Sequence, residues 1–230
     1  MGVLLMLMTI GGLVVAGILL AVAWLHESPW LKKFVLGGVA IWFAFYIVAL
    51  LAVSLTSKER TLSFNEPKEY CGFYLDCHMH TAVTGVERTK TIGDHAPNGE
   101  FYIVKVKVFT DAKRATLGLL TVDAKVLDDQ KNIYERDLAA EAQLPPQPAF
   151  ERFISPAESF EKEVVFDLPE TVENPRLDLR EGYGIDHLIE AVLIGDEDSI
   201  FHKRNYSTLS EPGAVATGFF PEQNQPVGVK

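Results

Sequence analysis

The sequence predicts a two-part protein: a hairpin of two membrane-spanning helices, followed by an all-β domain built as an antiparallel sandwich. Two long apolar runs without a charged side chain lie in the first quarter of the 230 residues. The composition changes near Ser57, and the chain beyond it is polar and acidic. There, short stretches of alternating apolar and polar residues are separated by Pro, Gly and Asp clusters, which is typical of strands and turns.

The two apolar runs cover residues 3–24 and 34–55 and predict a transmembrane hairpin over residues 1–57. Because an α-helix rises about 1.5 Å per residue, roughly 20 apolar residues are enough to cross the hydrocarbon core of a bilayer. The intervening LHESPWLKK predicts a short turn and therefore antiparallel helices. A cleaved signal peptide is the alternative for the first run, but this run is long and no basic residue precedes it.

Charge and cysteine content indicate where the two parts lie. Lysines flank the second apolar run on both sides, so the positive-inside rule gives little preference, whereas the N-terminus lacks Lys and Arg and is easy to translocate. The two cysteines favour an oxidising compartment. We therefore expect a two-pass protein of the inner (cytoplasmic) membrane with a large periplasmic domain. The net charge of −10 argues against a nucleic acid partner, which would need basic residues.

The rest of the chain divides into three segments. Residues 58–74 are expected to form a juxtamembrane linker, residues 75–209 the sandwich, and residues 210–230 an extended tail without periodicity. Alternation and turn signals predict strands within residues 75–93, 99–112, 119–127, 133–137, 159–169, 175–182 and 187–198. Residues 138–144, LAAEAQL, predict one or two helical turns before two prolines.

The order of these elements resembles the Ig-like β-sandwich of bacterial lipoproteins and membrane-anchored surface proteins, often described as an immunoprotective extracellular Ig-like domain. The resemblance rests on the stretches VERTKTIG, GEFYIVKVKVFTDA and FEKEVVFDLPETVENPRLDL and covers roughly residues 75–195. It implies an antiparallel Ig-like sandwich outside the cytoplasm and brings no catalytic residues. This chain departs from the family in having two helices in place of a lipobox and in its CHMH segment.

The segment YCGFYLDCHMH, residues 70–80, holds the candidate site residues. Cys71 and Cys77, the two cysteines of the chain, are separated by a loop that can bring them within disulfide distance. His78 and His80 would point to one face of a strand, while Cys77 and Met79 would point to the other.

A copper or zinc site would therefore use His78 and His80 with a third ligand, for which His95, His187 and His202 are the candidates. Covalent haem attachment needs C-x-x-C-H, and the spacing here is C-x5-C-H.

Motifs of common enzymes are absent from the sequence: there is no G-x-S-x-G elbow, P-loop or H-E-x-x-H. We therefore expect no catalysis and no cofactor. The expected function is a non-catalytic accessory or scaffolding subunit of a larger bacterial membrane complex, of the kind found in respiratory or photosynthetic electron transport. Candidate docking residues for partner subunits are Trp30, Trp42, Phe219 and Phe220.

Two alternatives remain. One is a periplasmic copper-binding or redox protein that uses residues 77–80. The other is an envelope protein that binds a ligand or senses stress.

Overall fold

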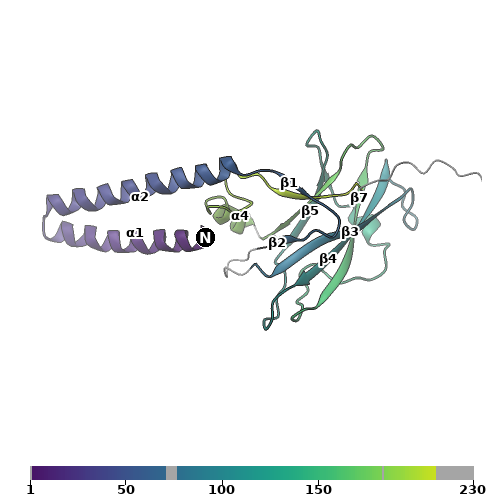
Figure 1. Cartoon of the computed structure of the whole chain (residues 1–230), viewed down its shortest axis with the longest axis horizontal. Coiled ribbons are helices and arrows are strands. Elements are labelled where there is room, and N and C mark those ends of the chain that lie inside the picture. The colour runs from purple at the N-terminus through teal and green to yellow at the C-terminus, as the bar shows by residue number, and fades with distance from the viewer. Residues whose placement is uncertain (1, 71–76, 183, 211–230) are drawn as a thin grey trace, which may run out of the picture.

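The computed structural model describes residues 2–70, 77–182 and 184–210, in which two helices project from one end of a β domain (Figure 1). Helices α1 (Gly2–Leu25) and α2 (Pro29–Thr56) run side by side, and both are long and apolar enough to cross a membrane. They are linked by a hydrogen bond from the indole Nε1 of Trp42 to Thr9 Oγ1, 3.0 Å long.

The second helix begins five residues earlier than the sequence analysis placed it, because Pro29 occupies its first turn. Proline is favoured there: its φ angle is already helical, and its missing N–H would have no partner in the first turn. The turn between the helices is correspondingly shorter than expected.

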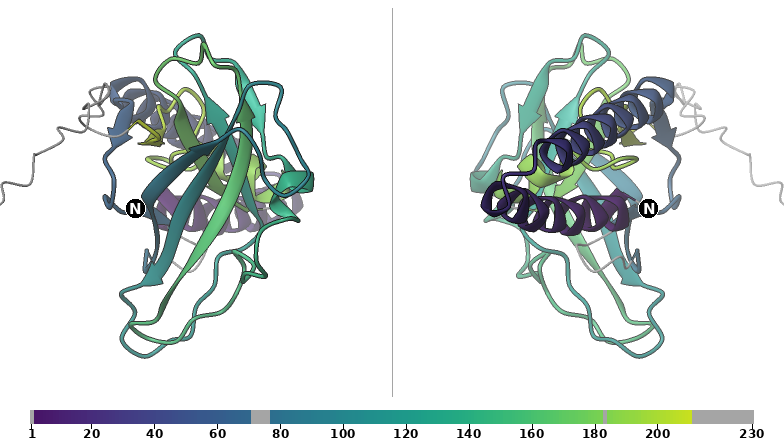
Figure 2. Two further views of the ribbon diagram at one scale, coloured as in Figure 1. Left: turned by 90° about the vertical axis from the view of Figure 1, so that its right-hand side faces the viewer. Right: turned by 90° about the vertical axis from the view of Figure 1, so that its left-hand side faces the viewer.

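The β domain consists of two facing sheets (Figure 2). One sheet has the order β1-β9-β8-β5-β6, formed by Arg60–Leu62, Asn205–Thr208, Arg176–Glu181, Val122–Leu127 and Ile133–Glu135. The other has the order β2-β3-β4-β7, formed by Lys68–Tyr70, Met79–Thr89, Glu100–Thr110 and Ser159–Leu168. Among the described strands, β1 and β9 pair in parallel and the other neighbours are antiparallel.

The space between the sheets is filled by one apolar core. Val104 and Val106 on β4 and Phe166 on β7 face Val126 on β5 and Leu177 on β8, and all five are buried. Alternate residues of a strand point to opposite faces, so the alternation seen in the sequence produces this core directly. The structure thus confirms two apolar N-terminal helices followed by a sandwich-like, all-β region.

The outer face of the second sheet is partly covered by α3 (Leu138–Glu141), which confirms the helical turns expected there. Asp137 caps this helix by accepting a hydrogen bond from the backbone N–H of Ala140. Ala140 packs with Ile92, Phe101 and other buried residues in a second, smaller apolar cluster.

Two sequence predictions were wrong. Residues 58–74 are not simply a linker, because they contain β1 and β2, which pair with β9 and β3. Residues 187–198 do not form a strand: α4 (Gly184–Glu190) and a series of turns occupy this region. The strand β8 already has β5 on one side and β9 on the other, which leaves no edge for another strand there.

Candidate functional site

The two histidines of the CHMH segment converge on one carboxylate. Met79 pairs with Thr110 in the β3–β4 ladder, so His78 stands opposite Asp111. The Nδ1 atom of His78 lies 2.6 Å from Asp111 Oδ1, and the Nε2 atom of His80 lies 3.4 Å from the same oxygen. The prediction that His78 and His80 share a face is therefore consistent with these contacts, and Asp111 joins them from the neighbouring strand.

The two imidazoles have different surroundings. His80 is buried and stacks on Phe109 with 5.1 Å between ring centroids. Its Nδ1 has no hydrogen-bond partner in the part of the chain that the structure describes. The side chain of His78 is about half exposed. The hydrogen bond with His78 lowers the pKa of the Asp111 carboxyl, which favours the charged carboxylate.

Imidazole nitrogens and a carboxylate are suitable ligands for zinc or copper. In the observed rotamers the three groups are not grouped tightly enough to share one ion, since the three-residue group that meets this condition among the described residues lies elsewhere. A shared ion would require these side chains to adopt other rotamers.

The three histidines considered as a third ligand have other contacts. His95 forms a bridge with Ile92 in the loop after β3. His187 contacts Glu190 and Asp198. His202 follows α4, and its backbone N–H donates to Ser199 O. Finding Asp111 from the sequence would have required the β3–β4 register.

The predicted disulfide falls partly outside the described residues. Cys77 is disulfide-bonded, whereas Cys71 lies in the segment 71–76, which the structure does not describe. The disulfide would restrain the chain immediately before His78.

A second cluster of functional side chains lies between the helices and the sheets. Lys68, on β2, is buried, and its Nζ lies 3.1 Å from Glu197 Oε2 and 3.8 Å from Asp178 Oδ1. Arg204 reaches Asp178 Oδ2 at 3.5 Å and Asp198 Oδ1 at 2.6 Å. These ion pairs tie β2, β8 and the segment that follows α4 into one network.

The network continues into α4. Asp198 also accepts a 2.7 Å bond from Arg180 and lies 3.3 Å from His187 Nδ1, which is 2.9 Å from Glu190 Oε2. His187, Glu190 and Asp198 place their ligand atoms within 4.8 Å of one another, as a metal site would. However, the two arginines on Asp198 already supply the positive charge. We therefore interpret this cluster as an ion-pair network.

Burial raises the pKa of several acidic side chains in this region. It raises the pKa of the Asp178 carboxyl, which Lys68, Arg204 and Arg180 partly oppose. Burial also raises the pKa of Glu190 and Asp196. In each case the cause is the loss of water around the charged form.

A cavity of about 490 Å³ opens on this network. Its lining combines apolar side chains, Val3 of α1 with Ile189 and Leu193, and charged ones that include Lys68 and Arg180. This volume is within the usual range for small-molecule sites. Sequence reasoning missed the cavity because its lining comes from residues 3 to 205 and follows no local motif.

The candidate docking residues have different positions. Trp30 is exposed near the helix turn and stacks on Phe34 with 5.5 Å between ring centroids. Trp42 is bonded to Thr9 between the two helices. Phe219 and Phe220 lie outside the described residues.

Comparison with known proteins finds one weakly similar solved structure. No protein family matches the sequence, and no curated protein matches it. The crystal structure of a secreted protein from Mycobacterium tuberculosis, MPT63, matches with a TM-score of 0.37 and 10% identity, covering 55% of this chain and 98% of that chain. A TM-score this low does not establish a shared fold.

Proposed function

We propose that this chain is a non-catalytic accessory subunit that braces partner proteins in a bacterial inner-membrane complex. In this proposal α1 and α2 cross the bilayer, and the β domain is an Ig-like sandwich in the periplasm. The observation that carries the proposal is the close connection between helices and sheets: the domain is packed onto its anchor. A domain held in this way can present its surface at a fixed height above the membrane.

The connection has several independent contacts. Only residues 57–59 separate α2 from β1, and β1 pairs directly with β9. Ser57 Oγ accepts a 2.8 Å bond from the backbone N–H of Lys203. Arg176 on β8 pairs with Glu59. A flexible tether would make none of these contacts.

The helices also offer a large apolar surface to a neighbour. Ile41, Phe45 and Val48 of α2 are among the many exposed apolar side chains of the hairpin. Within a membrane such side chains contact lipid tails or the helices of other proteins. This surface supports an assembly role, in which partner helices pack beside the hairpin.

Extraction of native membranes with a gentle detergent tests the proposal. We expect this chain in a particle much larger than itself, together with the same partner chains in repeated preparations. A photo-crosslinking residue in place of Ile41 should capture those partners. The same residue in place of Phe153, on the exposed surface of the β domain, tests whether that surface contacts them as well. Recovery as a free monomer without crosslinks would contradict the proposal.

A metal-binding role is the second candidate function, and the convergence of His78, His80 and Asp111 favours it. The full chain would be titrated with Zn²⁺ and Cu²⁺, and bound metal would be measured after gel filtration. Stoichiometric binding that is lost in His78→Ala, His80→Ala and Asp111→Asn, but kept in His95→Ala, would establish the site. Near-zero metal on the unaltered protein would dismiss it.

A further inference from the structure

We infer that residues 184–201, the segment containing α4, lie in the surface of the lipid bilayer and form a third membrane contact beside the two helices. This inference rests on the proposed function, in which α1 and α2 cross the membrane. The segment lies between the helix ends and the sheets (Figure 1). Three features of the segment indicate contact with lipid: its contacts with the helices, its exposed side chains and the pairing of its charged groups.

In this segment apolar side chains are exposed and a charged side chain is largely buried, the reverse of a surface that faces water. Leu188 and Phe201 are 72% and 68% exposed, and Val192 and Ile200 are also exposed. Asp198, in contrast, has only 12% of its side chain exposed and is paired with two arginines. Charged side chains are almost never buried unless paired, whereas clustered exposed apolar groups mark an interaction surface.

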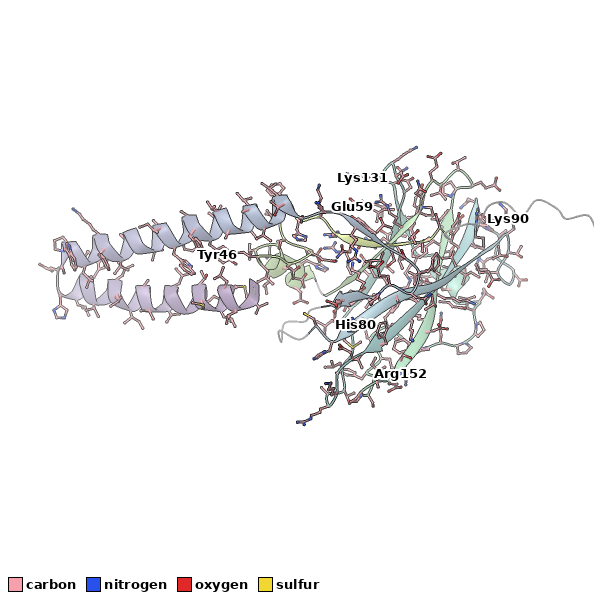
Figure 3. All side chains as sticks on the ribbon, in the orientation of Figure 1. Tyr46, Glu59, His80, Lys90, Lys131 and Arg152 are labelled. Atoms are coloured by element: carbon pink, nitrogen blue, oxygen red, sulfur yellow. The ribbon has the colours of Figure 1, made fainter. Side chains whose placement is uncertain are left out.

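The position of the segment along α2 fits the same environment. Tyr46, Leu50 and Ser54, spaced one helical turn apart, are buried on one face of α2. Tyr46 donates a 2.8 Å hydrogen bond to the carbonyl oxygen of Val192, and Figure 3 shows it on the side of α2 that faces the α4 region. The segment therefore packs alongside the last turns of a helix whose other faces are apolar and exposed.

The start of the first helix contacts the same segment. At the start of α1, a Cβ atom added to Gly2 would lie 2.5 Å from the carbonyl oxygen of Ile194, so the segment rests directly on the helix end. The ten residue-to-residue steps from Tyr46 to Thr56 rise about 15 Å at 1.5 Å per step. The segment is therefore level with helix residues that remain apolar, and Ile47, Val48 and Leu55 of this stretch are exposed.

Together, these three features indicate that the exposed apolar side chains of the segment contact lipid. Val192 is exposed and its carbonyl oxygen accepts the hydrogen bond from Tyr46, so an apolar residue of the segment adjoins the apolar helix α2. A segment with apolar residues on one side and polar groups on the other can lie at the boundary of headgroups and acyl chains. Its charged side faces the ion-pair network and the cavity.

The test uses the full chain in vesicles of phosphatidylethanolamine and phosphatidylglycerol. Single cysteines replace Leu188, Phe201, Leu138 and Ile47 in separate variants and are labelled with the environment-sensitive fluorophore NBD under non-reducing conditions. Leu138, 65% exposed on α3, is the matched leucine control. Helix α3, which carries Leu138, packs with Ile92. Lys90, two residues before Ile92, lies at the end of the domain far from α1 and α2 (Figure 3), so Leu138 is expected to be far from the membrane.

We expect the labels in Leu188→Cys and Phe201→Cys to emit at shorter wavelength than the label in Leu138→Cys. We also expect nitroxide lipids to quench them strongly and aqueous iodide weakly. Iodide quenching equal to that of Leu138→Cys would overturn the inference, as would shielding from both quenchers, which indicates protein contact. Ile47→Cys separates the two proposals. If nitroxide lipids quench the label in Ile47→Cys but not the labels in Leu188→Cys and Phe201→Cys, the helices cross the membrane and the third contact is wrong. If nitroxide lipids quench none of the three labels, the membrane anchor itself is wrong.

Discussion

Replacing Lys68 with methionine is expected to destabilise the β domain strongly at neutral pH, because Lys68 is the buried cation between two acidic residues. It is 5% exposed and lies 3.1 Å from Glu197 and 3.8 Å from Asp178. Methionine keeps most of the side-chain volume and removes the charge. Breaking a buried pair costs about 3–5 kcal/mol when the charge left behind has no other partner. Because Arg204 still lies 3.5 Å from Asp178, we expect a loss at the lower end of this range.

The loss should depend on pH through Asp178. Burial already raises its pKa, and Lys68 is the largest influence opposing that rise. Without Lys68, the folded protein holds the Asp178 proton up to a higher pH than the unfolded chain does. Stability then falls as the pH rises from the ordinary aspartate pKa, about 3.9, to the raised value. The deficit relative to the unaltered protein should therefore be largest at neutral pH and smaller in acid.

Urea unfolding of the full chain in detergent micelles, followed by the β-sheet signal in circular dichroism, measures the deficit. Lys125→Met is the matched control, because Lys125 also contacts two acids, Asp123 and Glu135, but is partly exposed. Exposed pairs contribute about 0–1 kcal/mol. If Lys68→Met lost no more than Lys125→Met, or lost the same amount at acid and neutral pH, the reasoning about the buried network would be refuted.

Two further substitutions test the packing of the domain, both by urea unfolding. Phe166→Ala removes a fully buried ring and is expected to lower the free energy of unfolding by about 3–5 kcal/mol. Phe153→Ala, at an exposed position, should change it by about 0.5 kcal/mol or less. Similar losses in the two variants would mean that the core is placed wrongly. Gly99→Ala puts a Cβ 2.1 Å from Leu168 O and should lose about 1–3 kcal/mol through overpacking. Gly85→Ala, whose nearest contact would be 3.9 Å away, should lose less, and the opposite order would contradict the close approach of Gly99 to Leu168.

The fold was predictable where one residue pattern had one explanation. The uncharged runs gave both helices, and alternation gave the strands Met79–Thr89 and Glu100–Thr110. The segment 187–198 was misassigned because its apolar residues fit a strand and a helix equally well. Contact with Tyr46 and the lack of a free edge beside β8 decided the outcome, and neither is visible in a local pattern.

The candidate site was predictable only in part for a related reason. The alternation of side chains along a strand placed His78 and His80 on one face. Asp111 could not be assigned, because its position opposite His78 depends on the length of the β3–β4 loop and on the irregular register between Val83 and Gly85. The buried network could not be found at all, since Lys68 and Asp178 come from distant parts of the chain.

The parallel pairing of β1 with β9 determines when this protein can finish folding. Arg60 leaves the ribosome soon after the second helix, yet its partner, Asn205, is made only after the rest of the domain. Until then, β1 has no partner strand, and an unpaired strand edge can pair with other chains. A product whose synthesis stops before residue 205 would therefore keep an unpaired β1 and would be prone to aggregation.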